Sequence, residues 1–353
     1  MLKLSHVIEE LVEEKGLDRG VLINVVCEGM LAAYKKKYPD LNISVTYNKK
    51  SDEIEVTIEK IIISSVTDEY TQISLRKARS IKENAQLGDI IQVPFEGTIG
   101  RIEILKAKQI IAQKIRNIEA SAIYNEFKPK ENTIVYGTVY KCEYNGAIIK
   151  LQEILAFLPR SLMIPGEKCI PGYSIRALLK EVYAEPRNEN QLILDRVSPD
   201  FLKKLFELEI PEVFEKLVEV KKVVRAAGYK SKVLVISHDK HVDPVGTCIG
   251  VDGVRIKPIL KELGSEKIDV ITLSGSLEDF VKDALKPAHI NRVEVVDNKN
   301  ANVWLDEDQR SLAIGKMGQN ISLACQLTGL NIHLMKSENE LEQDQENESM
   351  VEE

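Results

Sequence analysis

Apolar residues recur along this chain with two periods, one near 3.6 residues and one of two residues, which are typical of amphipathic helices and half-buried strands. In the last third of the chain, the same order of patterns occurs twice. The first copy has strand patterns at 218–225 and 232–237, a helical pattern at 254–263 and a strand pattern at 267–273. The second has a helix at 277–285, strands at 292–296 and 302–305, a helix at 319–327 and a strand at 331–335. The repeat predicts two copies of one α-β-β-α-α-β module.

Each copy carries a G-x-x-G tetrapeptide between two helical patterns. The tetrapeptides are Gly250-Val251-Asp252-Gly253 and Gly315-Lys316-Met317-Gly318. Positions without side chains let a nucleic-acid backbone approach main-chain N–H groups, and the N-terminus of the next helix adds partial positive charge. A KH module holds about four nucleotides of single-stranded RNA in this way. We therefore expect RNA binding at both tetrapeptides and at the flanking residues Arg255, Gln319 and Asn320.

The tetrapeptide by itself is a weak signal. With 19 glycines in 353 residues, chance supplies roughly one match. Gly97-Thr98-Ile99-Gly100 is such a match, and it lacks the frame of strands and helices around the other two. The order of elements, rather than the tetrapeptide, therefore indicates the tandem.

Short strand patterns follow one another between residues 133 and 198. They lie at 135–140, 147–151, 156–158, 173–182 and 191–194, with a hairpin turn at Asn145-Gly146. Five short strands in this stretch predict a small barrel of the OB type. Such barrels stack bases on exposed aromatic side chains and hold phosphates with Lys or Arg, so the candidate RNA contacts are Tyr140, Tyr144 and Phe157, with Lys141, Lys150, Arg160 and Arg196. An aromatic residue in so small a barrel is at least as often part of the core, and this alternative stays open.

The first 128 residues form a separate α+β pattern. Leu4, Val7, Ile8 and Leu11 make one helical stripe, and Asp18 can cap a second helix. Strand patterns at 42–47, 53–62 and 90–93 precede a long helix that ends before Pro129. Composition indicates only an interaction or packing domain.

Charge is unevenly distributed along the chain. The net charge is −7, but residues 337–353 carry eight acids and no base, so the remainder is +1. This aperiodic tail is predicted to be disordered. RNA binding must then depend on local basic patches, and the candidate is an acid-free run with Lys221, Lys222, Arg225, Lys230 and Lys232. The alternative for these residues is a solvated strand face.

Length and cysteine usage bound the class of protein. A chain of 353 residues is expected to form two to four domains. Five cysteines without a C-x-x-C pair make a disulfide framework or a zinc site unexpected and fit a reducing cytosol. Met1-Leu2-Lys3 leads into an amphipathic pattern, so neither a signal peptide nor a membrane span is expected.

Catalytic and metal-binding patterns are weak. His238-x-x-His241 near Asp243 lacks a second pair of ligands, which argues against a metal site. The chain has no G-x-S-x-G motif, no Walker loop and no paired-acid motif. The run from Asp306 to Asp308 is most simply a helix N-terminal cluster with Asp306 as the cap. We expect no metal, no cofactor and no catalytic residue.

An S1-type OB barrel followed by two KH modules, behind an α+β domain, resembles the NusA family of bacterial transcription factors. The resemblance covers residues 1 to about 336, and its most specific stretches are DPVGTCIG at 243–250 and AIGKMGQNISLA at 313–324. It implies a multidomain α+β protein with a polymerase-binding domain at 1–128, an S1 domain at 133–198, KH domains at 199–275 and 276–336, and a disordered acidic tail at 337–353.

The resemblance also implies a function. Members of this family bind the RNA polymerase core through the N-terminal domain and hold nascent single-stranded RNA with the S1 and KH modules. Together with other Nus factors they modulate pausing, intrinsic termination and antitermination. The resemblance implies a monomeric, non-enzymatic factor of the bacterial cytoplasm that needs no cofactor and contacts no membrane.

Two departures from the family pattern affect the first KH module. Asp252 would face phosphate and repel it, so the first loop is expected to be the weaker clamp. Pro258 removes a backbone donor inside the helix after this loop and should shift or kink that helix.

Two other functions stay open. One is an S1–KH accessory subunit of an RNA-decay or ribosome-associated machine, which would lack polymerase binding by residues 1–125. The other is a nuclease with RNA-binding appendages, but His6 is the only histidine among residues 1–130 and no carboxylate cluster accompanies it.

Overall fold

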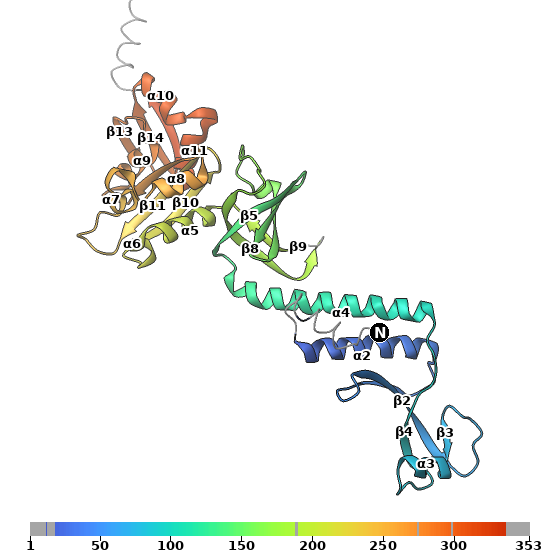
Figure 1. Cartoon of the computed structure of the whole chain (residues 1–353). Helices are drawn as coiled ribbons and strands as arrows, with labels where there is room; N and C mark the ends of the chain where they lie inside the picture. Colours follow the sequence, from blue (N-terminus) through green and yellow to red (C-terminus); the bar gives the residue numbers. More distant parts are fainter. Residues whose placement is uncertain (1–11, 13–17, 188–189, 274, 298, 337–353) are drawn as a thin grey trace, which may run out of the picture. The chain divides into compact units, whose positions relative to one another are not determined.

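The computed structural model describes residues 12, 18–187, 190–273, 275–297 and 299–336 (Figure 1). The chain falls into two compact units, Met1–Asn125 and Glu126–Glu353. The predicted stripe from Leu4 to Leu11 and the predicted disordered tail at 337–353 lie outside the described residues.

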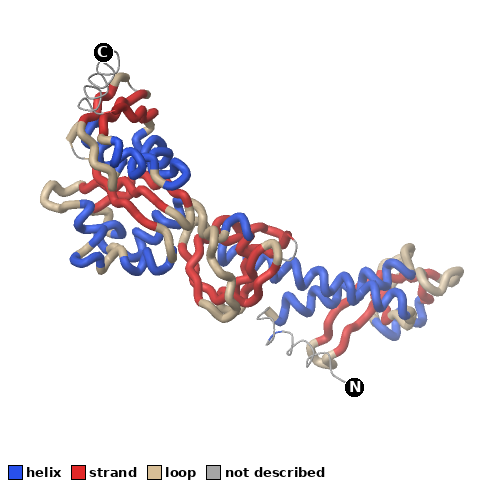
Figure 2. The backbone as a smooth tube through the Cα atoms, turned by 90° about the horizontal axis from the view of Figure 1, so that it is seen from above, coloured by secondary structure: helices blue, strands red, loops and turns tan. Residues whose placement is uncertain are grey.

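The first unit contains two long helices. Helix α2 (Arg19–Lys37) is capped by Asp18, whose Oδ1 accepts hydrogen bonds from the amides of Gly20 (2.8 Å) and Val21 (3.1 Å), which confirms the predicted cap. Helix α4 (Arg101–Phe127) lies beside α2 in both views (Figures 1 and 2). Gly29 permits this approach, because a Cβ there would come within 2.3 Å of Cγ1 of Ile111.

Strand β2 (Glu53–Ile63) organises the sheet of the first unit. Strands β1 (Ile43–Asn48) and β4 (Ile90–Pro94) pair with it antiparallel, and β3 (Gln72–Ser74) pairs with its end in parallel. Strand β3 and helix α3 (Leu75–Ile81) were not predicted, because such short segments do not show a full hydrophobic period.

The second unit begins with the predicted barrel. Its strands are β5 (Ile134–Glu143), β6 (Gly146–Leu151), β7 (Ile154–Pro159), β8 (Ser174–Arg187) and β9 (Asn190–Asp195). They close in the order β5-β6-β7-β9-β8, with only the β7–β9 pair parallel. The five-stranded OB-type prediction is confirmed.

One cysteine prediction was wrong. Cys142 at the end of β5 and Cys169 in the loop before β8 form a disulfide, although they are 27 residues apart. Barrel closure brings these segments together, and sequence spacing does not reveal that proximity. Cys27, Cys248 and Cys325 are free thiols.

Two KH modules follow, and each contains a three-stranded sheet covered by helices (Figure 2). The first contains α5 (Pro199–Glu209), α6 (Pro211–Phe214), β10 (Val218–Ala226), β11 (Lys230–Ser237), α7 (Pro244–Ile249), α8 (Lys257–Leu263) and β12 (Lys267–Thr272). The second contains α9 (Leu277–Leu285), β13 (Arg292–Val295), β14 (Asn300–Leu305), α10 (Glu307–Ile314), α11 (Gln319–Thr328) and β15 (Asn331–Lys336). In both sheets the first strand pair is antiparallel and the second is parallel. The predicted repeat is confirmed.

Pro258 shifts the start of the helix that follows the first loop. Helix α8 begins at Lys257, so that Pro258 lies in its first turn, where no intrahelical donor is needed. The corresponding helix α11 begins directly after Gly318 and is three residues longer, with 10 residues against 7. Of the two predicted effects of Pro258, a shift and a kink, the structure shows a shifted helix start.

Apolar cores join the parts of the second unit. Ile164 and Leu178 of the barrel pack in one cluster with Phe201, Leu205 and other residues of the first KH module. Val224 and Ile271 of the first KH module belong to the core of the second. Since burial of such residues is a main source of stability, barrel and KH modules support one another.

Candidate nucleic-acid interface

The two G-x-x-G loops have the same backbone geometry. Gly250 has φ 75° and ψ 169°, and Gly315 has φ 71° and ψ 176°. A Cβ at Gly250 would lie 2.9 Å from Cγ of Arg255, and one at Gly315 would lie 2.7 Å from Cβ of Asn320. Positive φ and close packing therefore both require glycine at the first position of each loop.

The middle residues of both loops point their side chains outwards. Val251 is 84% exposed and Met317 is 87% exposed, and their neighbours Lys316 and Asp252 are also exposed. Asp252 (φ 52°) and Met317 (φ 56°) occupy the same left-handed conformation. The second loop thus exposes a cation, Lys316, at its second position, whereas the first loop exposes an anion, Asp252, at its third position.

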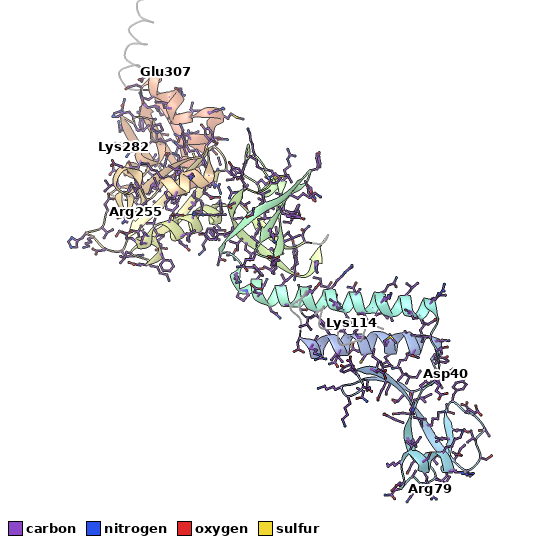
Figure 3. All side chains as sticks on the ribbon, in the orientation of Figure 1. Asp40, Arg79, Lys114, Arg255, Lys282 and Glu307 are labelled. Atoms are coloured by element: carbon purple, nitrogen blue, oxygen red, sulfur yellow. A yellow bond between two sulfur atoms is a disulfide. The ribbon has the colours of Figure 1, made fainter. Side chains whose placement is uncertain are left out.

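Two of the expected flanking contacts are bound to the protein itself. Arg255 forms an ion pair with Glu212 (2.7 Å) and donates to the carbonyl oxygen of Thr247 (2.8 Å); it is labelled in Figure 3. Asn320 is 2% exposed, and its Nδ2 donates to three carbonyl oxygens at 3.1–3.2 Å. The structure places Asn320 as a brace beneath the second loop instead of on the surface of the module.

Gln319 lies between this brace and the surface. Its side chain is half-buried, and its Oε1 has no hydrogen-bond partner within the described residues although it is buried. A buried acceptor of this kind is uncommon in folded proteins. The predicted loop residues of the second module therefore separate into an exposed pair, Lys316 and Met317, and an inner pair, Gln319 and Asn320.

The basic strand run does not form an exposed patch. Arg225 and Glu266 are an ion pair (2.8 Å) whose side chains are both fully buried. Lys230 and Lys232 share Asp269 at 2.8 and 2.7 Å, and burial lowers the pKa of Lys232. Lys230 and Lys232 also donate to Asn320 and to the carbonyl oxygen of Lys286 in the second KH module. Arg225 instead donates to the carbonyl oxygens of Arg196 and Ser198, where the barrel meets the first KH module. The patch prediction is therefore wrong for these three bases.

Lys222 is also engaged with the protein. Its Nζ donates to the carbonyl oxygens of Gln326 and, at 3.1 Å, Leu327, near the C-terminus of α11. Carbonyl groups at a helix C-terminus attract cations. Lys222 therefore links the two KH modules.

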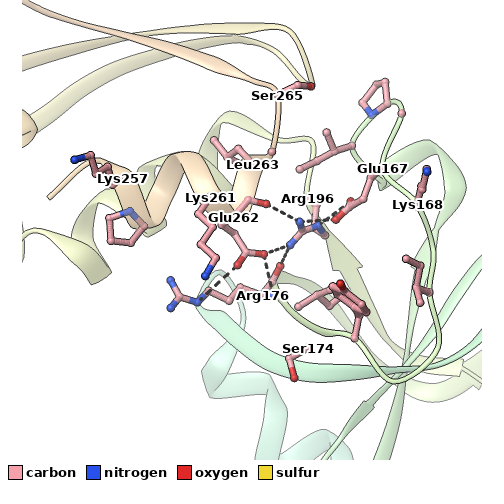
Figure 4. Close-up of a pocket in the computed structure, with 18 residues that line it drawn as sticks. Glu167, Lys168, Ser174, Arg176, Arg196, Lys257, Lys261, Glu262, Leu263 and Ser265 are labelled. Carbon is pink, nitrogen blue, oxygen red and sulfur yellow. Dashed lines mark hydrogen bonds and ion pairs between the residues drawn. The ribbon is translucent and has the colours of Figure 1, made fainter. Parts of the chain in front are cut away.

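Arg196 was wrongly predicted as a surface residue of the barrel. It is 1% exposed and forms ion pairs with Glu167 of the barrel (2.7 Å) and Glu262 of α8 (2.6 Å), as Figure 4 shows. A fully buried guanidinium needs such partners, because removing it from water is costly. Arg196 therefore joins the barrel to the first KH module.

Three of the other barrel candidates gather near one turn. Tyr144 is 93% exposed, Arg160 is exposed, and its amide donates to the carbonyl oxygen of Asn145 (2.8 Å). Phe157 is half-buried and packs close to Gly146. The structure thus brings Tyr144, Phe157 and Arg160 together, as an RNA contact would need, with Phe157 also contributing to the barrel.

Sequence reasoning named Tyr140 but missed two other exposed aromatic residues of the barrel, Tyr136 and Tyr173. Tyr136, Tyr140 and Tyr173 are 56%, 61% and 64% exposed, and the guanidinium of Arg176 lies over the Tyr136 ring at 5.3 Å. Tyr136 lies four residues before Tyr140 on β5, and this spacing was the available signal for Tyr136.

The histidine pattern has another role in the fold. Nε2 of His238 lies 3.2 Å from Oε2 of Glu219, and no group of three metal-ligating side chains occurs among the described residues.

Asp306 precedes α10 as predicted, but its carboxylate accepts a hydrogen bond from Asn291 (2.9 Å) and not from a helix amide. Over the residues described, no helix is both long and apolar enough to cross a membrane.

Comparisons with known proteins identify the family. Family models match at residues 3–121 (NusA N-terminal domain), 196–273 (NusA-like first KH domain) and 277–342 (NusA-like second KH domain). The transcription termination/antitermination protein NusA of Rickettsia conorii is 34% identical over 347 residues, which cover 96% of this chain and 68% of that protein. The NusA proteins of Bacillus subtilis (35% over 339 residues; 95% and 91%) and Thermus thermophilus (34% over 349 residues; 93% and 89%) are similarly close. This chain belongs to the NusA family of transcription termination/antitermination proteins.

Proposed function

We propose that this protein is a transcription elongation factor that binds RNA polymerase and nascent single-stranded RNA, and modulates pausing, intrinsic termination and antitermination. The observation that supports this most directly is the pair of exposed G-x-x-G loops with one backbone geometry, carried by packed KH modules. The match of residues 3–121 to the NusA N-terminal domain favours this function over an accessory role in RNA decay or at the ribosome.

The second G-x-x-G loop binds RNA more strongly than the first. Lys316 supplies a cation beside main-chain N–H groups in the second loop, whereas Asp252 opposes phosphate binding in the first. The barrel adds Tyr144, Phe157 and Arg160 as stacking and phosphate contacts. Within the proposal, the N-terminal domain (1–128) contacts the polymerase core and the S1 (133–198) and KH domains (199–275 and 276–336) contact RNA.

The protein acts as a monomer in the bacterial cytoplasm, joins other Nus factors during antitermination, and carries out no catalytic step. Sedimentation velocity of the full chain tests the monomer, since a dimer at micromolar concentration would contradict it.

The decisive experiment measures polymerase pausing at a hairpin pause site with the wild type and with Lys316→Asp plus Met317→Asp. Both side chains are exposed, and Asp252 already occupies the left-handed position equivalent to Met317, so the fold should tolerate this variant. The control, Lys282→Asp plus Gln326→Asp, changes net charge equally on helices α9 and α11.

The wild type and the control should prolong the pause, and the loop variant should prolong it less. A wild type that binds single-stranded RNA but leaves the pause unchanged would reject the polymerase role. A loop variant as active as the control would reject the second loop as an RNA clamp.

A further inference from the structure

A cleft of about 900 Å³ lies between the barrel and the first KH module (Figure 4). One wall is the loop from Ile164 to Tyr173 with the start of β8, and the other is helix α8 with the turn after it. Its volume falls in the range of ligand sites, roughly 300–1,000 Å³. None of the RNA contacts proposed above accounts for this cleft.

The cleft is basic. Its lining contains five basic and two acidic side chains. Both acids are engaged, because Glu167 and Glu262 bind the buried Arg196, and Arg176 is paired with Glu209. Three cations remain, Lys168, Lys257 and Lys261. All three are exposed, and within the described parts of the chain none of them has an ion-pair partner. The cleft therefore offers positive charge that none of the described residues neutralises by an ion pair.

These cations begin next to the first G-x-x-G loop. Cε of Lys257 lies 3.9 Å from the position that a Cβ on Gly253 would take. Lys261 follows one helical turn later on α8, so the two ammonium groups lie on one face. Lys168 stands on the opposite wall. A chain of phosphates that leaves the loop along this face would enter the cleft.

The barrel wall adds an apolar surface for bases. Tyr173 is 64% exposed and Ile170 is 42% exposed, and both line the cleft. Exposed aromatic side chains in basic grooves are the usual platforms on which single-stranded nucleic acids stack their bases. Unpaired lysines and an exposed tyrosine together match a nucleotide better than they match an acidic peptide, which would leave the tyrosine unused.

We propose that this cleft is an RNA subsite that holds the nucleotides next to those on the first G-x-x-G loop. Lys257, Lys261 and Lys168 contact the phosphates, and a base stacks on Tyr173. The subsite would extend the RNA path from the first KH module to the barrel and would compensate for the acidic Asp252 in the loop. The inference rests on the proposed function, since it requires RNA in the KH clamps.

The test compares RNAs of two lengths on the full chain. The tandem KH modules should hold about eight nucleotides, so the short probe is an unstructured A-rich RNA of about ten nucleotides. Two long probes each carry about four additional nucleotides, one probe at the 5′ end and the other at the 3′ end. One of the long probes should bind the wild type more tightly than the short probe does.

The variant Lys168→Ala plus Lys261→Ala removes the two cations that lie away from the loop. It should bind the long RNA no more tightly than the short one. For the long RNA, the slope of log K against log salt concentration should also become less steep by about 1.4, because each phosphate contact on a single strand contributes about 0.7 to this slope. Binding of the short RNA should not change. The control variant Lys240→Ala plus Lys299→Ala removes two exposed lysines outside the cleft and should keep the gain.

Tyr173 gives a second, charge-independent test. Tyr173→Ala should weaken binding of the long RNA at least about fivefold, as expected for loss of one stacked base, whereas Tyr173→Phe should retain it. The subsite is rejected if the short RNA binds but neither extension adds affinity, or if the double lysine variant keeps the gain. Failure of all RNAs to bind would instead reject the proposed function, and this inference with it.

Discussion

Nζ of Lys230 donates a hydrogen bond to Oδ1 of Asn320 across 3.1 Å, although the lysine lies in the first KH module and the asparagine lies in the second. The same lysine is held by Asp269 at 2.8 Å. Asn320 lies two residues after the second G-x-x-G loop, so this contact fixes the loop against the sheet of the neighbouring module. Buried polar groups therefore join the sheet of the first KH module to the base of the second loop.

Asn320→Ala should destabilise the second KH module by about 2 kcal/mol or more, because it leaves Lys230 and three buried carbonyl oxygens without their partner. Urea unfolding followed by the fluorescence of Trp304, the single tryptophan of the chain and part of this module, measures the loss. Gln326→Ala, on the exposed face of the same helix, is the control. Equal stability of the two variants would contradict the bracing role.

Glu262→Ala should loosen the junction of barrel and first KH module. It removes a 2.6 Å ion pair from Arg196, whose remaining partners, including Glu167, limit the loss of unfolding free energy to about 2–3 kcal/mol. Glu143→Ala breaks the exposed pair with Lys141 and should cost less than about 1 kcal/mol. Hydrogen exchange at β8 and α8 should increase only in the Glu262 variant.

Asp252→Asn should strengthen RNA binding at the first loop about fourfold, since one carboxylate about 5 Å from a phosphate in water is worth roughly 0.8 kcal/mol. Asparagine tolerates the left-handed conformation at this position, where φ is 52°. Titration with a short RNA at low salt measures the change. Glu278→Gln on α9 removes the same charge elsewhere and should leave affinity unaltered.

Alkylation of the unreduced, denatured protein should label three cysteines, because Cys142 and Cys169 are joined. Cys142→Ser should then lower the stability of the barrel by about 2–4 kcal/mol relative to the oxidised wild type. The difference should vanish in dithiothreitol, and Cys325→Ser should not reproduce it. Five labelled cysteines before reduction would refute the disulfide.

Burial, and secondarily the charge of Glu212, raises the pKa of Cys248 from about 9 to about 12. A group whose pKa is higher in the folded state contributes stability below its unfolded pKa and loses it as the pH rises through the folded value. The free energy of unfolding should therefore fall by up to about 1.4 kcal/mol per pH unit between pH 9 and 12. Cys248→Ala lacks this slope, and identical slopes in the two proteins would count against the buried thiol.

Much of the fold could be read from the sequence because it depends on local periodicity. Helix α9 has the predicted bounds at both ends, and strands β12 and β15 differ from the prediction by one residue each. The G-x-x-G loops were also recognisable, since positive φ at Gly250 and Gly315 restricts the choice of residue. Periods and glycine positions are properties of neighbouring residues, so they need no knowledge of the tertiary fold.

Only the tertiary structure decided which charged residues remain available to a ligand. Arg196, Arg225 and Lys232 look like surface bases in the sequence, yet packing between modules buries each of them against an acid more than 25 residues away. Lys168, Lys257 and Lys261 attract no notice in the sequence but meet around one cleft. Pairing between distant charges depends on how whole modules pack, because the cost of an unpaired buried charge selects partners in space and not along the chain.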